Sequence, residues 1–103
     1  MLESLPLHAP ETGEDGALVG LVVHVDRFGN CITNIGQESL PDRCTVEAAG
    51  EEYTVVRTYA SAKVGEPLAL VGSSGWLEIA VREGSAAERL GIVPGTRVVL
   101  RAE

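Results

Sequence analysis

Hydrophobic residues along this chain fall into short runs separated by glycine, proline and serine, a pattern typical of β-strands joined by tight turns. The first run is almost continuously apolar and rich in valine, which predicts a strand covered on both faces. Later runs are shorter, and two pairs of them flank hairpin-like connections at Ala49-Gly50 and Ser73-Ser74-Gly75. The predicted strands are Ala17–Val25, Cys31–Ile35, Arg43–Ala48, Glu51–Tyr59, Pro67–Gly72, Trp76–Arg82 and Arg97–Arg101.

One segment, Ser85–Leu90, has the signature of a short helix. Ser85 stands at the N-cap position, Glu88 follows three residues later as in a capping box, and Gly91 occupies the position that usually turns left-handed. Six or seven short strands at close spacing with one short helix suggest a barrel or a sandwich, and we predict an all-β fold, a small β-barrel of about six strands.

The first sixteen residues differ from the rest of the chain. They hold two prolines, two glycines and four acids, but no Lys or Arg and no hydrophobic period. We expect residues 1–16 to be a flexible, linker-like segment and residues 17–103 to be one folded domain. The segment also lacks the basic and long apolar regions of a secretory signal, so we expect a cytoplasmic protein.

Composition excludes several function classes. Fifteen Asp and Glu against eight Lys and Arg give a net charge of −7, which argues against nucleic acid as a partner. The longest apolar run falls well short of the ~20 residues that span a membrane, so no membrane partner is expected either. Cys31 and Cys44 belong to no Cys-x-x-Cys pair. We predict two buried thiols, leave a disulfide open, and predict no metal site.

The segment after the first strand, Asp26-Arg27-Phe28-Gly29-Asn30, is the first with candidate chemistry. One interpretation is an Asx-type turn, in which Asp26 and Asn30 bond the local backbone. The other is a ligand-binding corner, because an Asn amide matches an adenine edge, a Phe offers a stacking face and an Asp accepts from an ammonium group.

The turn Gly72-Ser73-Ser74-Gly75 is the second candidate. Its small residues allow a ligand to approach the backbone, and its hydroxyls and N–H groups could hold a carboxylate. The alternative is a hairpin turn whose serines are merely polar. It is not a nucleophile elbow, because a strand rather than a helix is predicted to follow.

The segment Val81–Thr96 looks on its own like the later part of a PDZ domain, with a capped helix and a Pro-Gly turn. A PDZ domain also needs a carboxylate-binding loop with alternating Gly and apolar residues, and Asn30 stands where an apolar residue belongs. A PDZ-like peptide-binding or scaffolding module is therefore the alternative function. A trimerisation domain that binds no ligand is a second alternative function.

Several blocks taken together resemble one family more specifically. The blocks Asp26–Ile35, Thr58–Ala60, Ser73–Val81 and Gly84–Ala87 are similar in order and spacing to the C-terminal domain of the S-adenosylmethionine hydroxide adenosyltransferases, the family that includes fluorinases and chlorinases. The resemblance covers roughly residues 17–102. It implies a small β-barrel that binds substrate, and a trimer in which this domain meets the N-terminal domain of a neighbour around S-adenosylmethionine. It also implies hydrolysis to adenosine and L-methionine without metal or cofactor.

The resemblance assigns four residues to the ammonium and nucleoside. Asp26 matches the family acid near the methionine ammonium, and Phe28 and Asn30 match the aromatic and amide at the nucleoside. Tyr59 matches an aromatic position lining the adenosyl pocket.

Three further residues are assigned by the same resemblance. Ser73 and Ser74 match the loop that holds the methionine end, and Glu83 stands where the family offers backbone groups to adenine. Val81 and Ser74 replace arginines of the halogenases, which favours the hydrolase branch. The family's water-activating residues belong to an N-terminal domain that these 103 residues do not contain, so no catalytic residue is predicted here and the chain is expected to be inactive alone.

Overall fold

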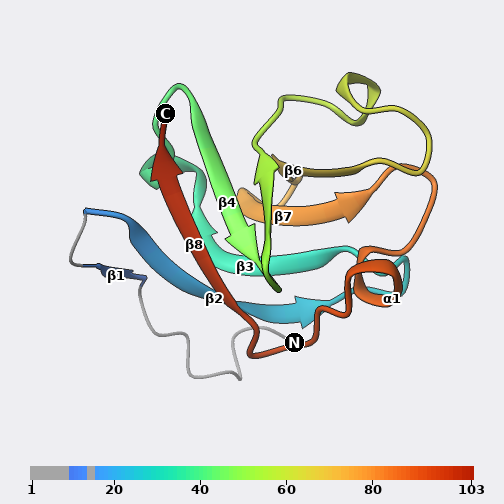
Figure 1. Ribbon diagram of the computed structural model, residues 1–103, viewed down its shortest axis with the longest axis horizontal. Helices are drawn as coiled ribbons and strands as arrows, with labels where there is room; N and C mark the ends of the chain where they lie inside the picture. Colours follow the sequence, from blue (N-terminus) through green and yellow to red (C-terminus); the bar gives the residue numbers. More distant parts are fainter. Residues whose placement is uncertain (1–9, 14–15) are drawn as a thin grey trace.

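The computed structural model describes residues 10–13 and 16–103, which form one strongly curved β-sheet (Figure 1). Its strands are β1 (Glu11–Thr12), β2 (Leu18–Val25), β3 (Cys31–Gly36), β4 (Cys44–Ala48), β5 (Glu51–Thr54), β6 (Pro67–Val71), β7 (Trp76–Val81) and β8 (Arg97–Ala102). One α-helix, α1 (Ala86–Leu90), and the 3₁₀ helices η2 (Gln37–Ser39) and η3 (Tyr59–Ser61) connect them. The all-β prediction with one short helix is confirmed. The count of about six strands is too low, since the sheet formed by the described residues has eight.

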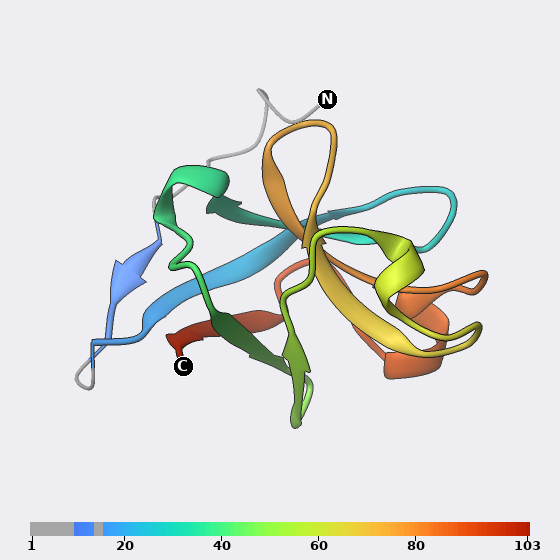
Figure 2. The ribbon, with the colours of Figure 1, turned by 90° about the horizontal axis from the view of Figure 1, so that it is seen from above.

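The sheet closes almost completely into a barrel rather than splitting into a sandwich. The strand order is β5-β4-β8-β2-β3-β7-β6, with β1 paired to β2. The two edges meet where Val55 forms a parallel bridge with Ala69, and the Val56 N–H donates to the Ala69 carbonyl at 2.8 Å. Figure 2 shows the same strands from above, crossing around one interior.

Several predicted boundaries change in the structure. The strand predicted over Glu51–Tyr59 ends at Thr54. The Val55 N–H still donates to the Cys44 carbonyl of β4, but Val55 also bridges Ala69, and the Val56 N–H donates to the Ala69 carbonyl of β6. The first long strand is not covered on both faces: Gly20 and Val22 are buried on one face, while Leu21 and Val23 on the other are partly exposed. Within the predicted linker, Glu11–Thr12 pairs with β2, and residues 1–9 and 14–15 lie outside the described part.

The predicted caps of the helix are confirmed. The Ser85 hydroxyl accepts a hydrogen bond from the Glu88 N–H at 3.2 Å, and Gly91 adopts φ 69° beyond the last turn. These two residues limit α1 to five residues, so it closes one end of the barrel rather than forming a separate layer.

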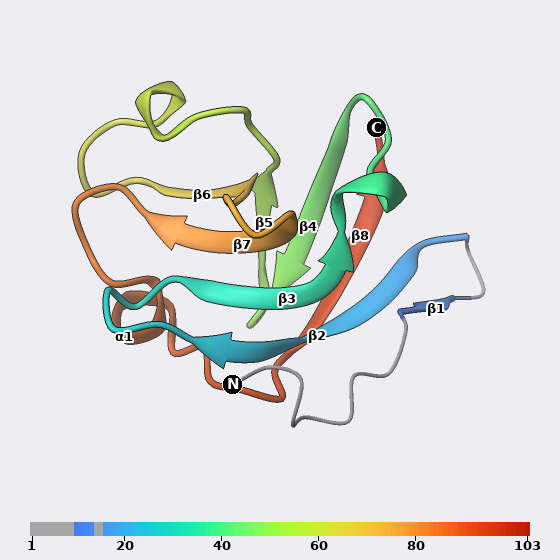
Figure 3. The ribbon, with the colours of Figure 1, turned by 180° about the vertical axis from the view of Figure 1, so that it is seen from behind.

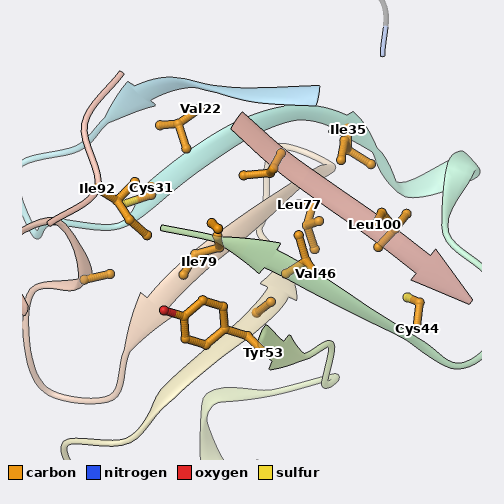
Figure 4. Packing of buried hydrophobic residues seen from close by; sticks show 14 of the residues in the cluster. Val22, Cys31, Ile35, Cys44, Val46, Tyr53, Leu77, Ile79, Ile92 and Leu100 are labelled. Carbon is orange, nitrogen blue, oxygen red and sulfur yellow. The ribbon is translucent and has the colours of Figure 1, made fainter. Parts of the chain in front are cut away.

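Side chains that fill the barrel are almost all aliphatic (Figure 4). Fully buried members include Val22, Ile35, Val46, Leu77, Ile79, Ile92 and Val98. Cys31 and Cys44 are both free and buried, which confirms the prediction of two buried thiols and excludes a disulfide between them in this structure. Tyr53 is the aromatic member, and its ring points inward with the hydroxyl on the side of Ile79.

A second, smaller apolar cluster lies on the outer face of β6 and β7. It consists of Ala62, Leu68, Leu70 and Ala80, with Val56 packed against it. The connection between β5 and β6 supplies Val56 and Ala62, so this loop covers part of the outer face. No helix in the described part of the chain is long and apolar enough to cross a membrane.

Candidate functional site

The loop between β2 and β3 is an Asx-type turn built on Asp26. Its Oδ1 atom accepts hydrogen bonds from the N–H groups of Phe28 and Asn30, each at 2.9 Å. Its Oδ2 atom accepts from Asn30 Nδ2 at 3.2 Å. The turn interpretation is therefore correct as local geometry, and the same bonds hold the Asn30 amide in one orientation.

Phe28 projects from this turn into solvent. Two thirds of the side chain is exposed (66%), and the Arg27 guanidinium lies 5.1 Å from the ring centroid. An aromatic ring held at the tip of a rigid turn is available for stacking on a planar ligand or for packing against a partner.

The turn is fastened to the start of α1. The Gly29 carbonyl accepts a hydrogen bond from the Ala87 N–H at 3.0 Å. Glu83 lies in the tight turn just before the helix, is exposed, and adopts the left-handed region at φ 57°. The structure thus brings Asp26, Phe28, Asn30 and Glu83 to one end of the barrel. In Figure 1 the β2–β3 turn and α1 lie at this end, on the right.

Tyr59 begins η3 in the connection between β5 and β6. This connection is tied to the end of β7, because the Gly65 N–H donates to the Arg82 carbonyl at 2.8 Å and the Arg82 guanidinium donates to the Ala62 carbonyl at 2.5 Å. The segment is therefore held near Glu83. The side chain of Tyr59 lies outside the part of the chain that the structure describes.

Ser73 and Ser74 lie in the turn between β6 and β7, at the opposite end of β7 (Figure 3). Both side chains are exposed. Ser74 lines a hollow of about 320 Å³ together with Gly36, Glu38 and Trp76. The predicted residues therefore form two groups, a turn-and-helix end (Asp26, Phe28, Asn30, Glu83) and a serine turn (Ser73, Ser74), separated by the length of β7.

Glu78 lies between the two groups and was not among the predicted residues. It is in the middle of β7 and only 9% exposed, although its neighbours Leu77 and Ile79 point into the core. The sequence did contain a signal, an acid inside the apolar run Trp76–Val81. Burial raises the pKa of the Glu78 carboxyl, and the charge of Asp26 raises it further.

Two polar residues of the block Asp26–Ile35 act within the sheet. The Thr33 hydroxyl donates to the Leu77 carbonyl at 2.8 Å, and the Asn34 Oδ1 atom accepts from the Leu21 N–H at 2.9 Å. Both bonds lie beside register shifts of β3 against its neighbours. These residues therefore satisfy the backbone where the ladder is irregular.

Comparison with known proteins defines the family. Residues 20–99 match the profile of the SAM hydroxide adenosyltransferase C-terminal domain. The chain is 41% identical over 99 residues to a protein named (R)-S-adenosyl-L-methionine hydrolase from Thermus thermophilus, and 37% identical over 101 residues to one of the same name from Salinispora tropica. These matches cover 96% and 95% of this chain but only 36% and 37% of those proteins.

Solved structures share this fold. A conserved hypothetical protein from Thermus thermophilus superposes with a TM-score of 0.77 at 40% identity, covering 94% of this chain and 38% of that one. An uncharacterized conserved protein from Thermotoga maritima gives 0.75 at 28% identity, over 93% and 40%.

The chain belongs to the C-terminal domain family of the SAM hydroxide adenosyltransferases. It spans a little over a third of the length of the curated relatives it matches. The PDZ-like alternative is not favoured, because the family match extends over residues 20–99, including the segment that suggested it.

Proposed function

We propose that this chain is the adenosyl- and methionine-binding domain of a cytoplasmic S-adenosylmethionine hydrolase, which converts S-adenosylmethionine and water into adenosine and L-methionine. Family membership and the names of the relatives support the reaction. The groups that activate water would come from an N-terminal domain, since the relatives are almost three times as long as this chain.

The observation that carries the proposal is the Asp26–Asn30 bond. Asp26 accepts one N–H of the Asn30 amide, which leaves the other N–H and the Oδ1 atom for a ligand. An amide fixed in this way presents a donor and an acceptor in one plane, as an adenine edge requires. Phe28 beside it supplies the exposed stacking face.

Beyond binding the substrate, the reaction requires no chemical group from this domain. Water attacks the ribose 5′ carbon and loses a proton, the bond between that carbon and sulfur breaks, and methionine leaves with the electron pair. Because the sulfonium is already a good leaving group, catalysis depends on positioning and desolvating the nucleophile. We propose that this happens between this domain and the N-terminal domain of a neighbouring subunit in a homotrimer.

The test is turnover with and without an N-terminal domain. The 103-residue chain should release no adenosine or methionine from S-adenosylmethionine. The chain joined to the N-terminal domain of the Thermus thermophilus relative should do so. Turnover by the chain alone would contradict this division of roles. Trimers that bind neither adenosine nor S-adenosylmethionine, measured by sedimentation and titration, would point to a purely structural domain.

A further inference from the structure

Glu78 is a buried carboxylate with no partner among the described residues. It pairs through its backbone with Ile32 on β3 and Leu70 on β6. Its strand neighbours Leu77 and Ile79 lie in the barrel core, so by alternation the Glu78 side chain leaves the sheet on the outer face. The side chain is 9% exposed, and neither a hydrogen bond nor an ion pair joins it to another described residue. A buried charge left in this way costs free energy unless a cation or a donor meets it.

The carboxylate is directed at the serine turn. A Cβ atom built on Gly72 would lie 1.8 Å from Glu78 Oε2 and 2.5 Å from its Cδ atom. Gly72 is therefore the residue that makes room for this carboxylate, immediately before Ser73. The oxygens also keep some exposed surface, because the only fully buried and unpartnered side-chain oxygen in the described part is that of Tyr53.

Asp26, whose charge acts on Glu78, has fewer acceptor positions left. Of the roughly four acceptor positions on a carboxylate, three of those on Asp26 are taken by the N–H groups of its own turn and by the Asn30 amide. The negative charge of Asp26 nevertheless acts on Glu78 and adds to burial in raising the pKa of the Glu78 carboxyl. A cation between the two carboxylates would relieve this repulsion.

We propose that Glu78 makes the direct contact with the cationic part of the ligand, with Asp26 as a second negative charge nearby. This inference rests on the proposed function, in which the ligand carries a sulfonium and an ammonium group. Glu78 stands on β7 between the turn-and-helix end, where Phe28 and Asn30 are assigned to the nucleoside, and the serine turn, which is assigned to the methionine end. A ligand that spans both passes over this carboxylate.

The test compares three ligands on the full 103-residue chain by NMR titration, which measures weak binding. S-adenosylmethionine carries both cations, S-adenosylhomocysteine carries the ammonium alone, and adenosine carries neither. Glu78→Gln should weaken S-adenosylmethionine about 10- to 100-fold, as expected for a buried charged hydrogen bond, and should change adenosine binding less than about twofold. The control is Glu52→Gln, which removes the same charge from an exposed position on β5 and should change neither.

Each outcome has a defined meaning. Equal losses for S-adenosylmethionine and S-adenosylhomocysteine identify the ammonium as the group that Glu78 contacts, and loss for S-adenosylmethionine alone identifies the sulfonium. Unchanged binding of S-adenosylmethionine, or an equal loss for adenosine, overturns the proposal. If the wild-type chain binds no adenosine, the proposed function fails and this inference with it.

A second measurement needs no variant. In the wild-type chain labelled with ¹³C at glutamate carboxyls, S-adenosylmethionine should shift the Glu78 resonance, whereas adenosine should not. A Glu78 resonance that is unmoved by saturating S-adenosylmethionine overturns the contact even if Glu78→Gln does not fold.

Discussion

Gly29 lies directly against Ser85, the cap of the helix. A Cβ atom at Gly29 would stand 2.0 Å from Ser85 Oγ and 2.8 Å from Ser85 Cα, and the backbone there has φ 84°. The ligand-binding corner proposed at Phe28 and Asn30 is therefore positioned by a contact that only glycine permits.

Gly29→Ala tests this contact. We expect a loss of about 2 to 5 kcal/mol in the free energy of unfolding, from left-handed strain plus overpacking against Ser85. Gly50→Ala is the matched control, because Gly50 has φ 82° with no atom within 4 Å, and it should lose only about 1 to 2 kcal/mol. Urea unfolding measures both, and equal losses would contradict a role for the Ser85 contact.

Asn30→Ala should weaken adenosine binding by about 1 to 3 kcal/mol, a range taken from amide contacts with adenine. The free energy of unfolding should fall by no more than about 1 kcal/mol, because the side chain donates only to Asp26 within the described part. Asn34→Ala should show the reverse pattern, since Asn34 accepts from the Leu21 N–H inside the sheet. If Asn30→Ala leaves adenosine affinity intact, the segment is a turn and nothing more.

Ser73→Ala and Asp26→Asn should each raise the KM for S-adenosylmethionine about fivefold in the chain joined to an N-terminal domain, as for one lost hydrogen bond. Ser73→Ala should not alter inhibition by adenosine, which lacks the amino-acid end, whereas Asp26→Asn should also weaken it because Asp26 orients the Asn30 amide. Ser39→Ala, in exposed η2, is the control for a lost hydroxyl. Parallel losses for both ligands in Ser73→Ala would place Ser73 away from the methionine end.

Tyr53→Phe should raise the free energy of unfolding by about 1 kcal/mol or leave it unchanged. The Tyr53 hydroxyl is buried without a hydrogen-bond partner in the described part, and such a group costs about 1 to 3 kcal/mol. Tyr53→Ala should instead lose about 3 to 5 kcal/mol, because the ring fills the barrel. A clear loss of stability in Tyr53→Phe would show that the hydroxyl has a partner.

The buried Cys31 thiol should make the free energy of unfolding depend on pH. Burial, with the nearby charge of Asp26, raises the pKa of this thiol from 9.0 to about 11. A group whose pKa is higher in the folded state stabilises the fold fully below its unfolded pKa, so about 2 to 3 kcal/mol should be lost as the pH rises from about 9 to 11. Urea unfolding at several pH values should show a smaller decline in Cys31→Ala. Parallel curves for the two proteins would contradict the shift.

Features that depend on residues close together in the chain could be predicted from the sequence. The helix at Ala86–Leu90 was predictable because its caps, Ser85 and Gly91, act within a few residues. The same holds for the Ala49-Gly50 hairpin and for the Asp26 turn, whose hydrogen bonds reach only four residues along the chain. The family was recognisable as well, because the order and spacing of its short motif blocks can be seen directly in the sequence.

Tertiary structure alone decided where these local pieces meet. Thr54 ends β5 because Val55 and Val56 bond Ala69 on β6, a partner that no local pattern reveals. The antiparallel pairing of β3 and β7 places the serine turn and the Asp26 turn at opposite ends of β7. It also turns Glu78, which in the sequence is one acid in an apolar strand, into a buried carboxylate between them, because burial and charge proximity are properties of the closed sheet and not of the chain.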